Sequence, residues 1–258
     1  MNETPRRERL DKLIIERGWA KSRPRAERLI SEFGILVDGE QVKKPGKRVA
    51  VTAELKPLGE EMPWVSRGAL KLLAALDAWP ELNPLGRIVL DVGSSTGGFT
   101  QVCLDRGAIG VCAVDTGTEQ LAEELRNDSR IDLHEQTNVL DLQPETLTSR
   151  FNALADVAVV DVSFVSVNLL LPALPKLLRG DAQVLVLVKP QFEVGPTGLG
   201  RNGIVRNARL RSQAVDRVRL KAMELGAEVA GEMESPVVGG DGNVEYLLWL
   251  RFTSLKSH

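Results

Sequence analysis

Four charged residues stand beside or directly after apolar segments of the chain: Lys71, Asp161, Lys189 and Glu245. Asp161 and Lys189 each follow a run of apolar residues typical of a buried strand. A charged side chain directly after a buried strand is not expected to lie in the core. Open α/β sheets bind their ligands at the carboxyl ends of their strands. Any one of these residues is also compatible with a solvated strand end. The four together predict a charged ligand site at one edge of a sheet.

A glycine-rich loop, Gly93-Ser-Ser-Thr-Gly-Gly98, follows another apolar run. Glycines let the backbone turn sharply and approach a ligand closely. The dinucleotide fingerprint G-x-G-x-x-G is incomplete because Ser95 stands for its middle glycine, and no lysine follows the glycines as a P-loop requires. Asp91 before the loop and Asp115 after the next apolar run suit a ligand that carries an amino group and ribose hydroxyls.

The elements that must position these residues alternate between strands and helices. Apolar runs predict strands at residues 88–92, 109–115, 155–161, 182–189, 227–233 and 244–252. Helical spacing predicts helices at 69–76, from the glycine loop to Asp105, and at 207–225, with Lys71 off the apolar stripe of the first. This alternation predicts an α/β fold with a mainly parallel sheet covered on both faces.

The first sixty residues follow a different pattern. Apolar residues at helical spacing predict one helix over residues 7–17 and a second helix capped by Ser22, with Pro24 in its first turn. The predicted apolar stripe of the second helix consists of Ala26, Leu29, Ile30 and Phe33. A strand at 35–37 followed by Asp38-Gly39 predicts a tight hairpin, so this part is expected to be a small α+β domain.

Charge is divided unevenly along the chain. Residues 1–59 hold 14 Lys and Arg against 9 Asp and Glu, a balance of +5, and the remaining 19 basic and 26 acidic residues give −7. A basic segment of this kind suits phosphate contacts, although a small solvated helical cap would look similar. The candidate RNA-binding residues are Arg6, Arg7, Lys12, Arg23, Arg25, Arg28, Lys43, Lys44 and Arg67. The Gly/Pro/Glu-containing stretch at 58–63 predicts a boundary between domains 1–59 and 67–258, with a linker at 60–66.

Other function classes are less compatible with the sequence. No apolar run approaches the roughly 20 residues that a membrane span needs, and the polar first residues do not form a secretory signal, so we expect a cytoplasmic protein. Cys103 and Cys112 lie nine residues apart, and only two histidines accompany them, so familiar ligand spacings predict no metal site.

Longer strings resemble known families. Arg9-Leu-Asp-Lys-Leu, Ser22-Arg-Pro-Arg-Ala-Glu-Arg-Leu-Ile and Ile35-Leu-Val-Asp-Gly resemble an S4 RNA-binding domain over roughly residues 7–55. Asp91-Val-Gly-Ser-Ser-Thr-Gly-Gly-Phe-Thr resembles the cofactor loop of FtsJ-like, S-adenosylmethionine-dependent methyltransferases with a Rossmann-like fold. Together with Val188-Lys-Pro-Gln-Phe-Glu, the whole chain is similar to the TlyA (hemolysin A) family, although Ala69 stands where that family often has a glycine.

The resemblance implies methylation of cytidine ribose 2′-hydroxyls in ribosomal RNA of one or both subunits, with ribosomal RNA or ribosomal subunits as partners. It implies that Lys71, Asp161, Lys189 and Glu245 form the catalytic tetrad. It further implies that Asp91 and the loop contact the methionine part of the cofactor, Asp115 the ribose, and Asn138 the adenine side. The implied cofactor contacts are Asp91, Gly93, Ser94, Ser95, Thr96, Gly97, Gly98, Phe99, Asp115 and Asn138.

In this scheme Lys189 is the candidate base, but neighbouring carboxylates favour a charged lysine, which cannot accept a proton. Either RNA binding desolvates Lys189, or Lys189 polarises the oxygen and the proton leaves late. The glycine-rich segment 195–203, which carries Arg201, is expected to be a mobile loop on the substrate side, or else an ordinary connection.

Three other functions remain to be compared with this one. They are a noncatalytic RNA-binding or ribosome-assembly factor, a membrane-active hemolysin, and a nicotinamide-dependent oxidoreductase. The intact glycine loop and tetrad argue against the first. The absence of an apolar span or a cationic amphipathic helix argues against the second, and Ser95 in the fingerprint argues against the third. The sequence predicts no oligomeric state.

Overall fold

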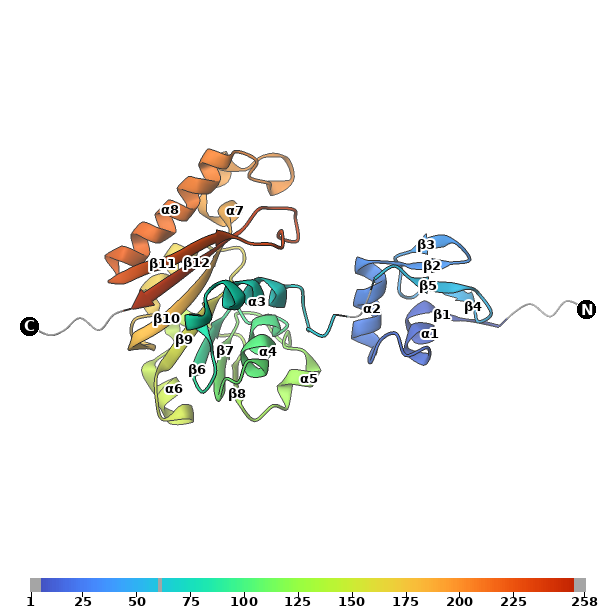
Figure 1. Ribbon diagram of the computed structural model, residues 1–258, viewed down its shortest axis with the longest axis horizontal. Helices are drawn as coiled ribbons and strands as arrows, with labels where there is room; N and C mark the ends of the chain where they lie inside the picture. The colour runs from blue at the N-terminus through green and yellow to red at the C-terminus, as the bar shows by residue number, and fades with distance from the viewer. Residues whose placement is uncertain (1–5, 60–61, 253–258) are drawn as a thin grey trace, which may run out of the picture. The chain divides into compact units, whose positions relative to one another are not determined.

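The computed structural model describes residues 6–59 and 62–252 and divides into two compact units (Figure 1). The first unit is Met1–Val65 and the second is Ser66–His258. Each contains its own cluster of buried apolar side chains. The linker expected at 60–66 stays a prediction, because its first two residues lie outside the described part of the chain.

The first unit combines two helices with short antiparallel strands. Its helices are α1 (Leu10–Glu16) and α2 (Arg23–Glu32). Its strands are β1 (Arg7–Arg9), β2 (Ile35–Val37), β3 (Glu40–Val42), β4 (Arg48–Ala50) and β5 (Leu55–Pro57). β1 pairs with β4, and a second sheet has the order β3-β2-β5. The predicted α+β class of this part is confirmed.

The hairpin between β2 and β3 has the predicted turn. Asp38 and Gly39 have φ angles of +49° and +88°, which a two-residue type I′ turn requires at both positions. Two local predictions were wrong. The helix predicted from Arg7 begins at Leu10, because residues 7–9 pair with β4, a long-range contact that local spacing does not reveal. Phe33, predicted in the buried stripe of α2, follows the helix and is 37% exposed.

The second unit is a sheet with helices on both faces. Its strands are β6 (Ile88–Val92), β7 (Gly110–Val114), β8 (Ile131–His134), β9 (Ala155–Val160), β10 (Leu178–Val188), β11 (Ala227–Glu234) and β12 (Tyr246–Phe252). Its α-helices are α3 (Gly68–Ala78), α4 (Gly98–Asp105), α5 (Glu123–Arg126), α6 (Pro144–Phe151), α7 (Pro190–Glu193) and α8 (Ala208–Glu224). The strand order is β11-β12-β10-β9-β6-β7-β8. The pairs β10–β12 and β11–β12 are antiparallel and the other four pairs are parallel, so the predicted mainly parallel α/β sheet is confirmed.

Apolar side chains cover both faces of this sheet. Leu147 of α6 and Val215 of α8 are buried against one face. Leu72 of α3 and Cys103 of α4 lie against Val157 of β9 on the other. None of the helices among the described residues is both long enough and apolar enough to cross a membrane.

The strand order reverses between β6 and β9. The chain adds β7 and β8 on one side of β6, and then β9 and β10 on the other side. Such a reversal opens a crevice at the carboxyl ends of the two central strands, where open α/β sheets bind ligands. Gly93 follows β6 and Asp161 follows β9, so the topology brings the glycine loop and a tetrad residue to this crevice.

Candidate active site

Asp161 and Lys189 form an ion pair beyond the carboxyl ends of the adjacent parallel strands β9 and β10. Lys189 Nζ lies 2.6 Å from Asp161 Oδ1 and donates a hydrogen bond of 2.8 Å to Ser163 Oγ. The Lys189 and Asp161 side chains are 10% and 19% exposed, so solvent screens the pair only partly. Asp161 Oδ1 accepts no aligned hydrogen bond, which makes the contact ionic in character.

Lys71 and Glu245 form the second ion pair of the predicted tetrad. Lys71 Nζ donates a hydrogen bond of 2.6 Å to Glu245 Oε2, and the two side chains are 10% and 3% exposed. Lys71 is therefore buried, although its place off the apolar stripe of α3 suggested otherwise. Charges this deeply buried persist only when they are paired, since removal of one partner leaves the other uncompensated.

Helix α3 connects the two ion pairs. Gly68, in its first turn, lies so close to Asp161 that an added Cβ would be 3.9 Å from Oδ2. Lys71 follows three residues later, on the same side of the helix. The structure thus brings all four tetrad residues together as two ion pairs, one at each end of a single helical turn.

A cavity of about 480 Å³ lies beside the Asp161–Lys189 pair. Gly93, Ser95, Asp115 and Asn138 from the predicted cofactor set line it, together with Asp161. The cavity wall also includes Gln120, Ser163 and Phe164, which the sequence analysis did not single out. Ser163 and Phe164 follow Asp161 directly, so proximity in sequence to a strand-end carboxylate was the available signal.

Asp91 lies in β6 with no exposed surface, behind the glycine loop. Thr100 Oγ1 donates a hydrogen bond of 2.6 Å to its Oδ2, whereas Oδ1 has no partner. Burial raises the pKa of Asp91 to about 7, and the neighbouring Asp161 and Asp115 add to this effect. The hydroxyl of Ser94 is likewise buried without a partner. Buried polar atoms normally have partners, so these two atoms indicate donors and acceptors that a ligand supplies.

Asp115 and Asn138 also line the cavity and are already held in place. Asp115 accepts hydrogen bonds from the backbone N–H groups of Ser95 (2.8 Å) and Gly117 (2.7 Å). Asn138 accepts one of 3.0 Å from Leu140 and so caps a short 3₁₀ helix. Each oxygen can accept a second hydrogen bond, which leaves the Asp115 carboxylate able to bind a ribose diol.

The remaining residues of the glycine loop have structural surroundings. A side chain at Gly93 would strike the carbonyl of Asp161, so only glycine permits this approach of β6 and β9. Gly97, with a φ of +93°, packs against Leu121 and Leu125, and Gly98 packs against Ser66. Thr96 is exposed and Phe99 is 4% exposed. Of the predicted cofactor residues, six do not line the cavity: Asp91, Ser94, Thr96, Gly97, Gly98 and Phe99.

Glu193 connects the two loops that carry the Asp161–Lys189 pair. This carboxylate, 8% exposed at the end of α7, accepts hydrogen bonds from Ser166 Oγ (2.6 Å), Val167 N (2.8 Å) and Asn168 Nδ2 (2.9 Å). Because α7 begins directly after Lys189, Glu193 ties the Lys189 segment to the Asp161 segment. The sequence analysis quoted Glu193 only as part of a motif.

Phe164 stands out on the rim of the cavity. It is 92% exposed and has a φ of +67°, a conformation that bulky side chains rarely adopt. Its ring lies 5.6 Å from that of Phe192 on α7. Strained residues cluster at functional sites, and an exposed aromatic face suits stacking against a planar group.

The structure gathers one set of residue types that could bind a metal ion, although sequence spacing predicted none. Ligand atoms of Cys112, Asp132 and His134 lie within 4.8 Å of one another on neighbouring strands β7 and β8. Burial raises the pKa of the Cys112 thiol to about 12, and His134 Nε2 already lies 2.9 Å from Asp132 Oδ2. A neutral thiol beside a satisfied His–Asp pair fits an ordinary sheet interior.

Most of the predicted RNA-binding side chains in the first unit make local contacts. Lys12 pairs with Glu8 (3.1 Å), and Arg23 pairs with Glu27 (3.1 Å) and with the buried Asp11 (3.3 Å). The other contacts go to backbone carbonyls: Arg7 to Arg48 (2.9 Å), Arg25 to Pro63 (3.4 Å), Arg28 to Trp64 (3.4 Å) and Lys43 to Glu32 (3.1 Å). Arg6 and Lys44 are exposed, and Arg67 is exposed in the second unit before α3.

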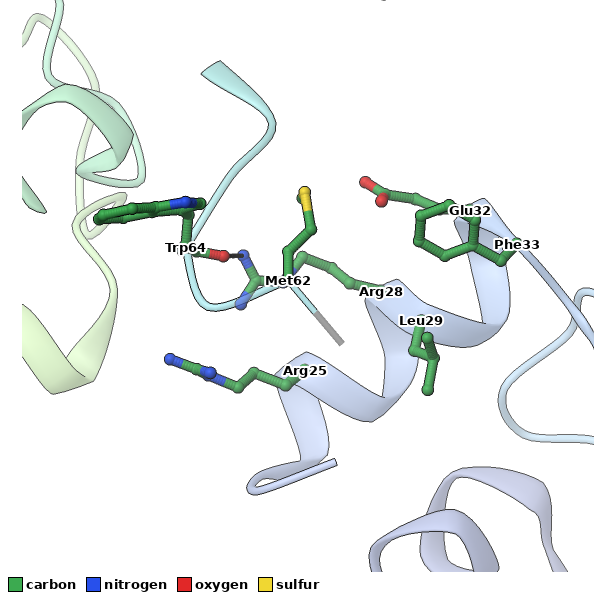
Figure 2. Close-up of a pocket in the computed structure, with 7 residues that line it drawn as sticks. All are labelled: Arg25, Arg28, Leu29, Glu32, Phe33, Met62 and Trp64. Carbon is green, nitrogen blue, oxygen red and sulfur yellow. Dashed lines mark hydrogen bonds between the residues drawn. The ribbon is translucent and has the colours of Figure 1, made fainter. Parts of the chain in front are cut away.

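Figure 2 shows Arg25 and Arg28 extending from α2 toward the segment that carries Met62 and Trp64. Leu29, Glu32 and Phe33 of the same helix face complete a small recess, in which cationic and aromatic groups lie side by side. Guanidinium and aromatic groups together favour nucleic-acid contacts, so this face of α2 is a candidate RNA surface.

Comparisons with known proteins agree with this arrangement. The S4 domain family matches residues 8–55, and the FtsJ-like methyltransferase family matches residues 64–252. The 16S/23S rRNA (cytidine-2′-O)-methyltransferase TlyA of Mycobacterium tuberculosis is 45% identical over 95% of this chain and 90% of its own length. Hemolysin A of Brachyspira hyodysenteriae is 32% identical over 93% of this chain and 98% of its own.

A solved structure of a Streptococcus thermophilus protein described as a hemolysin has a TM-score of 0.74 and 41% identity. The match covers 97% of this chain and 90% of that one. The order of the two matched domains and the near full-length similarity agree. The chain therefore belongs to the TlyA (hemolysin A) family, in which an S4 domain precedes an FtsJ-like methyltransferase domain.

Proposed function

We propose that this methyltransferase uses S-adenosylmethionine to methylate the ribose 2′-hydroxyl of cytidine in ribosomal RNA. The observation that carries the proposal is the Asp161–Lys189 ion pair of 2.6 Å, in which Asp161 lines a 480 Å³ cavity together with residues of the glycine loop. The M. tuberculosis relative is named for this reaction on 16S and 23S rRNA. The proposed substrate places the activity in the cytoplasm.

The residues present fit S-adenosylmethionine. The unpartnered Oδ1 of Asp91, which is buried next to the glycine loop, suits a cationic amino group, and Asp115 in the cavity lining suits the ribose diol. Gly93, Ser95 and Asn138 line the same cavity. When bound, the cofactor supplies an electrophilic sulfonium methyl group, so the protein has to align the acceptor oxygen and manage its proton.

Lys189 is the group that meets the acceptor oxygen in this proposal. Ser163 accepts a hydrogen bond from the Lys189 ammonium group and Asp161 lies beside it as an ionic partner, so N–H donors remain for the substrate. The charged lysine donates a hydrogen bond to the 2′-oxygen and stabilises negative charge that develops there. The hydroxyl proton would pass to water as the methyl group leaves the sulfonium sulfur, which keeps the bonding electron pair, and binds the 2′-oxygen. Lys71 and Glu245 fix α3 beneath Asp161.

The first unit supplies the RNA-binding surface in this proposal. The match to the S4 family covers residues 8–55, and the basic residues of this segment include Arg25 and Arg28 on α2. Its charge balance of +5 favours a polyanion, whereas the remainder of the chain is acidic.

The reaction is tested with purified protein, tritiated S-adenosylmethionine and ribosomal subunits from cells that lack this chain. We expect label in the RNA at cytidine residues that become resistant to alkaline cleavage, because methylation removes the attacking 2′-hydroxyl. Label on a base instead of a ribose would contradict the proposal. A chain that binds RNA but shows no calorimetric signal with S-adenosylhomocysteine would be a noncatalytic RNA-binding factor.

A further inference from the structure

The segment after α7 has an unusual charge composition for the second unit. Residues 194–215 include Arg201, Arg206, Arg209 and Arg211 and contain no Asp or Glu. They lie in a part of the chain whose overall balance is −7. A segment with four arginines and no acidic residue is therefore exceptional in this acidic part of the chain.

Three of these arginines differ from every other cationic side chain of the unit. Arg201, Arg206 and Arg209 are exposed, and their side chains make no hydrogen bond or ion pair within the described chain. All other described Arg and Lys side chains of residues 66–252 have a partner. Examples are Arg130 with Asp128 and Arg219 with Glu232. The unpartnered cations are thus confined to a single short segment.

Arg211, in the same segment, makes hydrogen bonds within the protein. Its guanidinium donates to the carbonyls of Val205 (3.2 Å) and Arg206 (3.0 Å) and to the hydroxyl of Tyr246 (3.3 Å). It therefore supports the backbone that carries the other three arginines, which extend into solvent. This division indicates a built surface and not a random accumulation of charge.

The segment is fixed to the catalytic edge of the sheet at both ends. Upstream it continues from α7, which begins directly after Lys189. Downstream, the 1%-exposed Asn243 accepts a hydrogen bond from Val205 N (2.9 Å) and donates one to the Gly203 carbonyl (3.2 Å). Asn243 lies two residues before Glu245, the partner of Lys71. The segment that carries the three arginines therefore continues in sequence from Lys189 and is hydrogen-bonded to the loop that leads to Glu245.

We infer that Arg201, Arg206 and Arg209 bind the phosphate backbone of the RNA strand that enters the active site, as a second RNA surface on the methyltransferase unit itself. Planar guanidinium groups donate two parallel hydrogen bonds to a phosphate, and exposed arginines without carboxylate partners keep these donors available. The inference rests on the proposed function, because it assigns this surface to the same RNA substrate. It also gives the glycine-rich 195–203 segment a role in substrate binding.

The test compares two triple variants of the full-length chain. Arg201→Ala/Arg206→Ala/Arg209→Ala removes the surface, and Arg87→Ala/Arg106→Ala/Arg179→Ala removes the same charge near the opposite ends of the strands, as a matched control. With ribosomal subunits as probe, we expect the first variant to raise the KM for RNA by about 10- to 100-fold. Its S-adenosylhomocysteine affinity and melting temperature should match those of the wild type, because the three side chains are exposed.

Salt dependence identifies the ligand chemistry. Each lost phosphate contact lowers the slope of log affinity against log salt by about 0.7 to 0.9, so three contacts change it by about 2 to 3. The Arg→Lys triple should keep most of the slope because it keeps the charge. An unchanged RNA KM and salt slope in the Ala triple would overturn the inference. So would a loss of affinity for intact subunits but not for deproteinised rRNA, which would indicate a protein partner.

The test of the three arginines can fail or succeed independently of the test of the proposed reaction. If the wild-type chain binds ribosomal RNA but transfers no methyl group to it, the proposed reaction is wrong. The salt slopes of the two triples then still decide whether the three arginines contact phosphate.

Discussion

Each ion pair of the tetrad joins a lysine to a carboxylate, but the two pairs have different surroundings. Lys71 and Glu245 are enclosed by protein, so their charges serve mainly to compensate each other. Lys189 is held by Asp161 and Ser163, both of which line the cavity. The two lysine side chains are equally exposed, at 10%, so the difference lies in their partners: Glu245 is 3% exposed, whereas Asp161 is 19% exposed and lines the cavity. The proposed mechanism therefore gives the reaction to Lys189 and a positioning role to Lys71.

Replacement of Lys189 by Ala or Met should lower the rate of methyl transfer by about 10²- to 10⁴-fold, because positioned acid–base and polarising groups contribute that much. Cofactor affinity should remain largely intact, since Lys189 is not among the residues that line the cavity. Single-turnover transfer of tritiated methyl groups measures the first quantity, and calorimetry with S-adenosylhomocysteine measures the second. Lys176→Ala, an exposed lysine in the same unit, is the control. Turnover by Lys189→Ala close to the wild-type rate would remove Lys189 from the mechanism.

Asp91 should make cofactor binding dependent on pH. Burial raises the pKa of Asp91 from 3.8 to about 7, and a cationic amino group binds the carboxylate form. Below pH 7 the carboxyl must lose a proton before it binds, so affinity should fall about tenfold per pH unit, and it should level off above pH 7. Calorimetry in buffers from about pH 5.5 to 8.5 tests this. Asp91→Asn should bind weakly with no such slope, and an equal slope in that variant would assign the titration to another group.

Asp91 should also affect the stability of the unliganded chain. Its folded-state pKa lies above its ordinary value of 3.8, so protonated Asp91 stabilises the folded state most at pH values below 3.8. This contribution is lost as pH rises through about 7. The melting temperature of the wild type relative to Asp91→Asn should therefore fall between these two pH values. A constant difference across that range would show that Asp91 does not titrate in the folded chain.

At the scale of elements, the sequence predicts best the parts that local periodicity determines. Strands β6, β7, β9, β11 and β12 and helices α4 and α8 lie within a few residues of their predicted positions. β8 was missed because Ile131–His134 is half-buried along its whole length and carries no apolar run. α6 was missed because it buries only Leu147. Edge elements of this kind depend on contacts that are distant in sequence.

The candidate site shows the same limit. Residue types at strand ends identified Asp161 and Lys189, but not that Lys189 also donates to Ser163. Nor did spacing reveal that Lys71 is buried against Glu245, 174 residues away in the chain. Pairings between segments arise from the order of strands in the sheet, which local patterns do not specify.

Glu193→Gln should slow catalysis although Glu193 touches neither cavity nor substrate in the proposed mechanism. Its carboxylate holds three donors of the 166–168 segment and thereby sets the distance between Lys189 and Asp161. Glutamine cannot accept from all three, and a displacement of about 1 Å at a reacting group can cost about 100-fold in rate. We expect a fall in kcat with little change in the KM for RNA. Glu193→Asp, which keeps the charge but shortens the reach, should behave similarly.

Asp156→Asn is the matched control for Glu193. Asp156 accepts hydrogen bonds from Ile88 N (2.9 Å) and Arg179 (3.0 Å) at the opposite end of the same sheet. The Asp156→Asn substitution should lower the melting temperature of the protein without a specific loss of kcat. If Glu193→Gln is destabilised as much as Asp156→Asn but turns over at the wild-type rate, Glu193 holds the fold and does not position Lys189.

At the scale of the whole molecule, charge and chemistry are divided between two units. All residues that line the cavity, between Val92 and Leu170, belong to the second unit. All RNA-binding residues predicted from the sequence except Arg67 belong to the first. A basic module raises the local concentration of a polyanionic substrate at an acidic catalytic unit, which otherwise repels it.

A chain that begins at Ser66 should therefore retain cofactor binding and lose substrate affinity. The second unit has its own core, in which Leu90, Val186 and Leu248 are buried, so S-adenosylhomocysteine affinity should match that of the full chain. Loss of the linked RNA module should raise the KM for ribosomal RNA by about 100-fold or more, because the two surfaces no longer bind one molecule together. The residual KM should still depend on salt through Arg201, Arg206 and Arg209. Wild-type kcat/KM in the truncated chain would show that the S4 domain does not bind the substrate RNA.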